Sequence, residues 1–130
     1  MANPNIVNVS TIYGTTTYYT PSGTTAVVLL ANAASSGIVY KINNIVAANV
    51  TAGTPTITVS IYTNGAVAQG SAPSGGTAYP IIFQSTVPAN AAFVVVDKST
   101  SFYLQENTSI SITSGTASAV TYTVSYEAIS

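Results

Sequence analysis

The sequence predicts an all-β protein: a single-domain β-sandwich or jelly roll of about eight short antiparallel strands. Three observations favour this fold. Residues 56–62, Thr-Ile-Thr-Val-Ser-Ile-Tyr, alternate strictly between apolar and hydroxylated side chains, which is the period of a half-buried strand. Turn-forming residues recur between such segments at regular intervals. Glu and Lys, which favour surface helices, are almost missing, whereas β-branched residues are abundant.

The expected strands follow one another along most of the chain. We divide it into an extended N-terminal strand or arm, residues 1–13, and a β-sandwich domain, residues 14–130. Strict alternation predicts strands at 56–62, 109–113 and 120–127. More continuous apolar runs predict strands covered on both faces, in the centre of a sandwich or against another subunit. These runs occupy residues 26–31, 38–50, 79–87 and 93–96, with turn signals at 21–23, 35–37, 52–53, 88–90, 97–99 and 114–115.

The N-terminal segment carries enough apolar surface to require a partner. We take its apolar residues as candidate interface residues: Ile6, Val7, Val9 and Ile12. Two interpretations stay open, since the segment is either the first strand of the domain or an arm laid on a neighbouring subunit. Sequential strands often pair locally, which favours the first interpretation.

Nine tyrosines stand out, because tyrosine combines an apolar ring with a polar tip and is enriched at interfaces. Tyr122 and Tyr126 alternate with valines in the last expected strand, so we place them in the core. Tyr13, Tyr18 and Tyr19 lie outside the clearest strands, and we expect them at an interface.

Residues 64–78 form a low-complexity stretch of Gly, Ala, Ser and Pro, near the upper end of ordinary loop lengths. We interpret this stretch as a flexible loop of the domain. A binding loop is the alternative.

The composition argues against several classes of function. Only 4% of the residues are charged, the net charge is −1, and two basic side chains cannot form the basic patch that binds nucleic-acid phosphates. No apolar run approaches the ~20 residues that span a bilayer. The N-terminal sequence lacks the features of a signal peptide. We therefore expect no direct contact with nucleic acid or membrane.

Residues suited to catalysis are scarce. Histidine and cysteine are absent, which removes the commonest general base and the thiol nucleophile. The carboxylates Asp97, Glu106 and Glu127 are the remaining candidates for acid–base or metal chemistry. Each is better explained as a solvated charge in a turn or on the polar face of a strand. We expect no enzymatic activity, no cofactor and no metal.

The shortage of charge favours permanent assembly. Free β-proteins guard exposed sheet edges with Lys, inward charges or Pro, and net charge keeps molecules apart. This chain places almost no charge on its expected strands. Such edges are tolerable where neighbouring subunits cover them, so the sequence predicts a subunit that associates with its own copies and with other proteins.

Four segments with the pattern of strands and turns carry a resemblance to known proteins: residues 18–29 (YYTPSGTTAVVL), 87–96 (VPANAAFVVV), 103–110 (YLQENTSI) and 121–130 (TYTVSYEAIS). They resemble segments of small virion structural proteins of tailed bacteriophages, especially marine cyanophages. The resemblance covers most of residues 18–130. It implies a virion location, a role as a capsid decoration or head–tail accessory subunit, and partners among its own copies and virion proteins such as the major capsid protein.

Two other hypotheses stay open. In the first, the chain is a self-polymerising filament subunit, or a tail, neck or fibre subunit, and residues 1–13 complete a neighbour's sheet by strand addition. In the second, it is a carbohydrate-binding β-sandwich module whose site is built from tyrosine and asparagine side chains.

Overall fold

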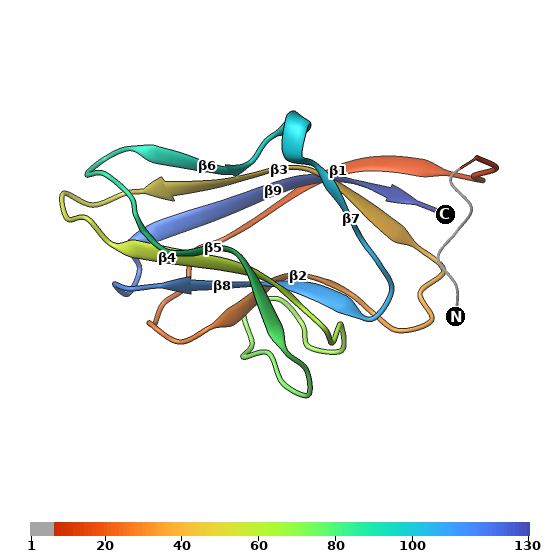
Figure 1. Ribbon diagram of the computed structural model, residues 1–130, viewed down its shortest axis with the longest axis horizontal. Helices are drawn as coiled ribbons and strands as arrows, with labels where there is room; N and C mark the ends of the chain where they lie inside the picture. The colour runs from red at the N-terminus through yellow and green to blue at the C-terminus, as the bar shows by residue number, and fades with distance from the viewer. Residues whose placement is uncertain (1–6) are drawn as a thin grey trace.

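The computed structural model describes residues 7–130 and folds them into two antiparallel β-sheets packed face to face (Figure 1). The first sheet has the strand order β1-β9-β3-β6, with the short strand β7 also paired to β3, and the second has the order β2-β8-β4-β5. The elements are β1 Ile12–Tyr19, β2 Val27–Asn32, β3 Val39–Asn49, β4 Thr56–Tyr62, β5 Ala78–Thr86, β6 Ala92–Val96, the 3-10 turn η1 Lys98–Thr100, β7 Phe102–Leu104, β8 Thr108–Ser114 and β9 Val120–Ile129. The prediction of an all-β sandwich is confirmed.

Strand pairing is nested along the chain: β4 with β5, β3 with β6 and β7, β2 with β8, and β1 with β9. The chain is therefore one long hairpin, rolled so that successive pairs lie in alternate sheets, which is the arrangement of a jelly roll. Strands β6 and β7 face different parts of β3 and act as one interrupted strand. Nine strands thus fill eight positions, in agreement with the expected number.

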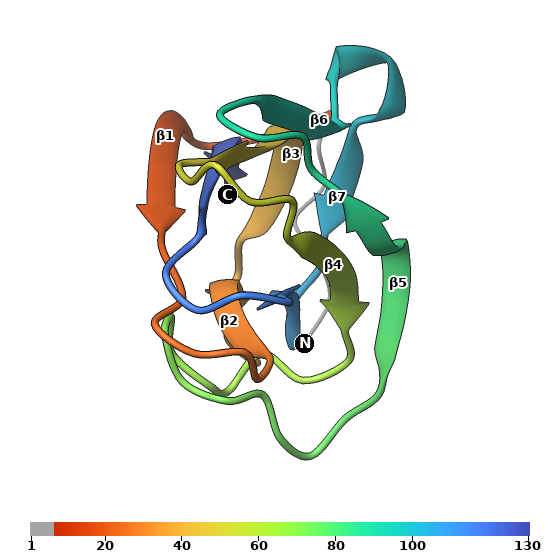
Figure 2. The same cartoon turned by 90° about the vertical axis from the view of Figure 1, so that its left-hand side faces the viewer.

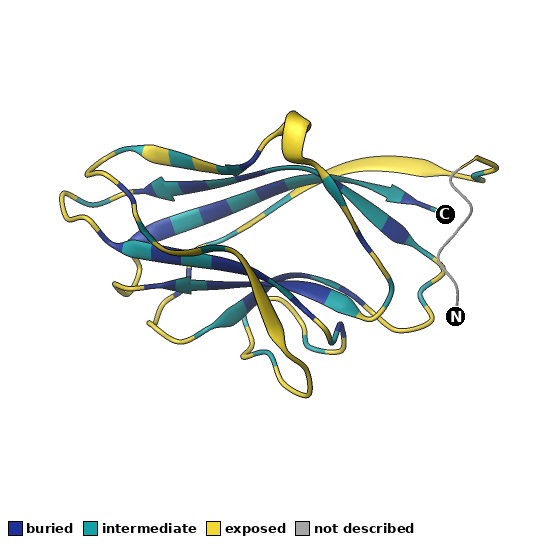
Figure 3. Ribbon diagram, viewed as in Figure 1, coloured by how far each residue is buried: buried dark blue, intermediate teal, exposed yellow. Residues whose placement is uncertain are grey.

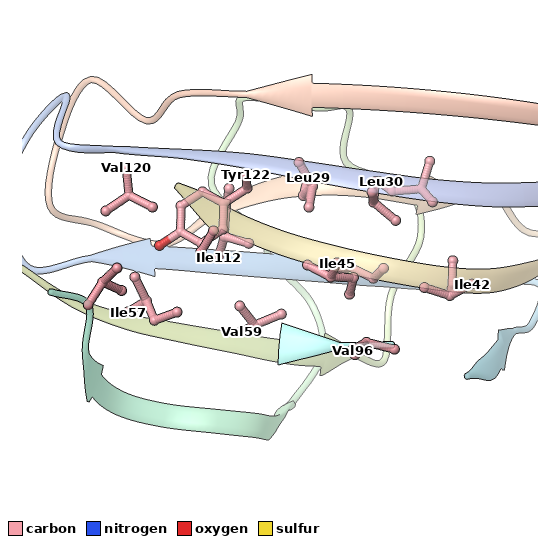
Figure 4. Packing of buried hydrophobic residues seen from close by; sticks show 14 of the residues in the cluster. Leu29, Leu30, Ile42, Ile45, Ile57, Val59, Val96, Ile112, Val120 and Tyr122 are labelled. Atoms are coloured by element: carbon pink, nitrogen blue, oxygen red, sulfur yellow. The ribbon is translucent and has the colours of Figure 1, made fainter. Parts of the chain in front are cut away.

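The core lies between the sheets and consists of alternate residues of the central strands. Figure 4 shows Ile57 and Val59 of β4 facing Ile45 of β3 and Tyr122 of β9. Tyr122 is completely buried, and Tyr126 is partly buried against the same cluster, as expected from their register. Central strands alternate because one face meets the opposite sheet while the other meets solvent or a covering loop.

The first strand differs from the sequence-based expectation. Within residues 7–130 it begins at Ile12 and runs to Tyr19, so it contains all three tyrosines that we placed outside the clearest strands, Tyr13, Tyr18 and Tyr19, while residues 1–6 of the expected N-terminal strand or arm lie outside the described residues. The reason is that Thr and Tyr suit a pleated strand and that β9 supplies an unbroken row of partners from Ile129 to Tyr122. Local alternation of apolar residues gives no sign of such a strand, because both of its faces are largely exposed.

The β4–β5 loop, residues 63–77, packs against the outer face of the second sheet (Figure 1, light green). The hydroxyl of buried Ser109 donates a hydrogen bond to the carbonyl of Asn64 at 2.9 Å. The N–H of Gly76 donates to the hydroxyl of Tyr62 at 3.0 Å. The flexibility of this segment stays a prediction. Motion of the loop away from the sheet would have to break these hydrogen bonds.

Candidate interaction surfaces

The sandwich ends in four edges, two for each sheet: β1 and the interrupted β6–β7 strand in the first, β2 and β5 in the second. Figure 2 shows β1 and β5 on opposite sides of the molecule. The outward N–H and C=O groups of an edge strand are a template for pairing with another chain. Proteins commonly obstruct such edges with loops, prolines, bulges or charges. The four edges of this molecule differ in this respect.

The edge of β2 is closed by the β4–β5 loop. The N–H of Val28 donates to the carbonyl of Ser71 at 2.9 Å, and the N–H of Gly70 donates to the carbonyl of Val28 at 2.9 Å. The side-chain amide of Gln69 donates to the carbonyl of Leu29 at 2.8 Å. The loop therefore occupies the position that a further strand would take.

The edge of β5 is irregular. Pro80 lies within the strand and has no N–H to offer a neighbour. The pairing of β5 with β4 shifts register twice, between Ile57 and Val59 and again between Val59 and Ser60. Gln84 adopts a positive φ of 48° beside these shifts. Proline and bulges of this kind turn an edge away from regular pairing.

The β6–β7 edge is short and interrupted. Strand β6 has five residues, β7 has three, and η1 separates them. Asp97 caps this turn: its carboxylate accepts the N–H groups of Ser99 at 2.9 Å and Thr100 at 3.2 Å. Hydrogen bonds from Ser99 lower the pKa of Asp97, so the carboxylate stays charged to lower pH. A fixed charge next to Lys98 thus stands in the middle of this edge.

Strand β1 has no proline, bulge or charge among the described residues, and the β4–β5 loop meets it through a side chain, since the amide of Gln69 donates to the hydroxyl of Thr17 at 3.1 Å. The strand pairs with β9 over eight residues with no shift of register. Figure 3 shows it exposed along most of its length. Its outer backbone groups are therefore open to a further strand.

The direction of the backbone groups of β1 follows from its first pair. The N–H of Thr11 donates to the carbonyl of Ser130 at 3.1 Å, and the N–H of Ser130 donates back at 3.0 Å. Hydrogen-bonded pairs alternate in an antiparallel ladder, so the odd-numbered residues of β1 are bonded to β9. The even-numbered residues direct their N–H and C=O groups to the free edge: Ile12, Gly14, Thr16 and Tyr18.

Exposed apolar side chains accompany this edge. Ile12 is 54% exposed, Tyr13 66% and Tyr18 69%. Three of the interface residues expected from the sequence thus lie together on β1. Tyr19, the fourth on this strand, is half-buried and packs against the core.

The remaining expected interface residues precede the strand. Val7 is exposed and Val9 half-buried, while Ile6 lies outside the described residues. The N–H of Ser10 donates to the carbonyl of Ser130 at 2.6 Å, so the chain is already held to the end of β9 before β1 begins. Residues 12 and 13 pair with β9 in the same subunit. This part of the N-terminal segment acts as an internal strand.

A second group of exposed apolar side chains lies on β5, β6 and β7, and none of its members was among the candidate interface residues. Its members are Tyr79, Ile81, Phe83, Val94 and Tyr103. We expected strands at 79–87 and 93–96 to be covered on both faces, and within this subunit they are not. Pro80 is the one sequence signal of an edge strand, because proline is confined to edges and bulges.

Two of the three carboxylates, Asp97 and Glu106, hold local structure. Besides the capping role of Asp97, Glu106 accepts the N–H of Gly37 at 3.1 Å, and Glu127 lies beside Lys41 in the pairing of β9 with β3. Across residues 7–130 no cluster of three or more metal-ligating side chains is present. Within the same residues no helix is long and apolar enough to cross a membrane.

Fold and surface together define a jelly-roll β-sandwich with one regular, unobstructed sheet edge. Comparison of the sequence with protein-family models and with curated proteins found no match.

Proposed function

We propose that this chain is a non-enzymatic structural subunit that acts by protein–protein assembly, and that the assembly is the particle of a tailed bacteriophage. The single observation that carries the assembly role is the β1 edge, which is regular, uncharged and flanked by exposed Ile12, Tyr13 and Tyr18. An edge of this kind exposes a free β-protein to uncontrolled association. In an assembly the same edge is a binding surface.

Two further observations support the proposal that the assembly is a phage particle. Jelly rolls are common in viral capsid proteins, although a fold alone does not define a function. The sequence segments at 18–29, 87–96, 103–110 and 121–130 resemble virion proteins of tailed phages. Within the particle we propose a capsid decoration or head–tail accessory role, with the major capsid protein and further copies of this chain as partners.

Fractionation of phage particles tests this proposal. Phage particles are taken from the lysate of infected cells in which the chain is expressed, and they are banded on a density gradient. The amount of the chain in each fraction is measured by quantitative mass spectrometry. We expect it to band with the major capsid protein at a fixed copy ratio after washing with high salt. If the chain stays at the top of the gradient with soluble host proteins, the virion role is wrong.

A further inference from the structure

We propose that two copies of this chain pair through β1, antiparallel and about a two-fold axis, so that their two β1–β9–β3 sheets join into one continuous sheet. The inference rests on the proposed assembly role and names the partner at the unobstructed edge, a second copy of the chain. The other three edges are excluded by a bound loop at β2, by Pro80 and bulges at β5, and by η1 at β6–β7.

Backbone complementarity favours a second copy as the occupant. A two-fold axis perpendicular to the sheet places the core-facing sides of the two subunits on the same side of the joined sheet. Opposing side chains in an antiparallel pair point to the same side, so even-numbered residues must oppose even-numbered residues of the partner, and odd-numbered residues must oppose odd-numbered ones. The even-numbered residues are those that direct N–H and C=O groups outward. Even residues therefore oppose even residues, and every outward donor meets an outward acceptor without any change in the strand. The edge is complementary to itself.

The length of β1 selects one register. With Thr15 on the axis, Ile12 opposes the partner's Tyr18, and Gly14 opposes the partner's Thr16. The four resulting pairs exchange about eight backbone hydrogen bonds. Moving the axis to Thr16 places Ile12 opposite Thr20, which lies beyond the end of the strand. The register centred on Thr15 therefore pairs the largest number of outward backbone groups within the strand.

Side chains support this register. Ile12 and Tyr18 are more than half exposed and lie opposite each other on the outer face, so pairing covers both. An aromatic side chain buries about 150–250 Å² when fully covered. The two copies each of Tyr13 and Tyr18, about two-thirds exposed in one subunit, therefore add at most roughly 400–650 Å² to the area from the backbone and from Ile12.

The size of this interface sets its expected strength. Specific interfaces begin near about 1,000 Å², so the pair lies near the lower limit and we expect weak association, with a dissociation constant on the order of micromolar. Such an affinity suits a contact that is repeated within a larger assembly, where neighbouring contacts raise the effective concentration. The absence of charge on β1 leaves no repulsion between two identical strands.

Cysteine cross-linking tests the register directly, because the chain has no cysteine of its own. Thr15 is an odd-numbered residue on the axis, so its two copies form a non-hydrogen-bonded pair with Cα atoms about 4.5 Å apart, close enough for a disulfide. We expect Thr15→Cys in the full chain to form disulfide-linked dimers in mild oxidant. The matched control Thr17→Cys opposes the partner's Tyr13 and should stay largely monomeric. Cross-linking of Thr16→Cys in preference to Thr15→Cys would overturn the register.

Analytical ultracentrifugation tests the pairing itself. We expect the unmodified chain to shift from 13.2 kDa towards twice that mass as its concentration rises through the micromolar range. Thr16→Pro removes an outward N–H without breaking the β1–β9 ladder, and Thr16→Lys places two charges near the axis. Both should stay monomeric, while Thr113→Lys on the opposite sheet should dimerise like the unmodified chain. Circular dichroism checks that each variant is folded. If Thr16→Pro does not fold, the test rests on Thr16→Lys.

The outcomes separate this pairing from the particle role. If the chain is monomeric at all concentrations, or if Thr16→Lys dimerises as well as the unmodified chain, the β1 pairing is wrong. Particle fractionation is independent of that result, because a monomeric chain that bands with the capsid retains its virion role. A chain that dimerises through Thr15 but never bands with particles supports the pairing and contradicts the virion role.

Discussion

Asn49, at the end of β3, joins two connecting segments of the chain through one buried amide. Its nitrogen donates to the carbonyls of Gly53 at 2.8 Å, Pro88 at 3.0 Å and Val87 at 3.3 Å. Its oxygen accepts the N–H of Thr51 at 2.9 Å and the Thr51 hydroxyl at 2.7 Å. The β3–β4 turn and the β5–β6 connection are therefore held to the same side chain.

We expect Asn49→Ala to lower the free energy of unfolding by about 2–4 kcal/mol, because it leaves several buried polar groups without a partner. Urea denaturation measures this change. The control is Asn44→Ala on the outer face of the same strand, for which we expect a loss below about 0.5 kcal/mol. Equal losses in the two variants would show that the Asn49 network adds nothing.

Tyr122 gives the molecule a dependence on alkaline pH. The side chain is fully buried, and its hydroxyl bonds to the Ser114 hydroxyl at 2.8 Å and the Thr113 carbonyl at 3.1 Å. Burial raises the pKa of Tyr122 to about 12, and the hydrogen bond from Ser114 offsets part of that rise. The native state therefore keeps the phenol protonated where an unfolded chain, with a pKa near 10, loses the proton.

The resulting stabilisation is complete below pH 10 and is lost as the pH rises through 12. A difference of two pKa units corresponds to roughly 2–3 kcal/mol. We expect the difference in unfolding free energy between the unmodified chain and Tyr122→Phe to be constant from pH 8 to about 9.5. Above pH 10 the unmodified chain should lose stability faster than the variant. Parallel curves up to pH 12 would exclude Tyr122 as the titrating group.

At the scale of elements, the β4–β5 loop depends on a close approach at Gly65. A Cβ atom at this position would collide with the carbonyl oxygen of Asn32, at the end of β2. The N–H of Gly65 also donates to the side chain of Asn107 at 3.3 Å. Only glycine allows the loop to pass this point and continue to the edge of β2.

We expect Gly65→Ala to detach the loop, so that the Val28 and Gly70 amides exchange with solvent at least tenfold faster. Hydrogen exchange followed by mass spectrometry measures this change. Gly53→Ala is the control, since its added Cβ has nothing nearer than 3.8 Å. If both amides already exchange at unprotected rates in the unmodified chain, the interpretation of this segment as a flexible loop is correct and its contacts with β2 are transient.

Strand prediction succeeded where alternation was strict and also at the continuous apolar runs, which correspond to β2, β3, β5 and β6, and it failed at β1. Residues 56–62 and 109–113 were expected as strands and correspond to β4 and β8, because one face of each meets the core and the other does not. Strand β1 was missed as an element, since both of its faces are largely exposed and its sequence shows no apolar period. The candidate site lies on that strand, so the sequence supplied its tyrosines but not their arrangement.

At the scale of the whole molecule, the low charge makes stability almost independent of salt. Five charged side chains and a net charge of −1 leave few electrostatic interactions to screen. We expect the free energy of unfolding to change by less than about 0.5 kcal/mol between about 20 and 500 mM NaCl. Denaturation curves in the two buffers check this, and a salt dependence of several kcal/mol would reveal an electrostatic contribution that these few charges do not explain.

The sequence by itself determined the all-β class, the number of strand positions, the core placement of Tyr122 with Tyr126 packed against that core, and the scarcity of charge. These properties depend on local alternation and composition, which a linear sequence displays. Only the tertiary structure decided which strands are edges and which of those edges are obstructed. Nested pairing joins β1 to β9 and the β4–β5 loop to β2 across long stretches of chain. A residue's own neighbours in sequence therefore cannot reveal that the edge of β2 is closed and that of β1 is open.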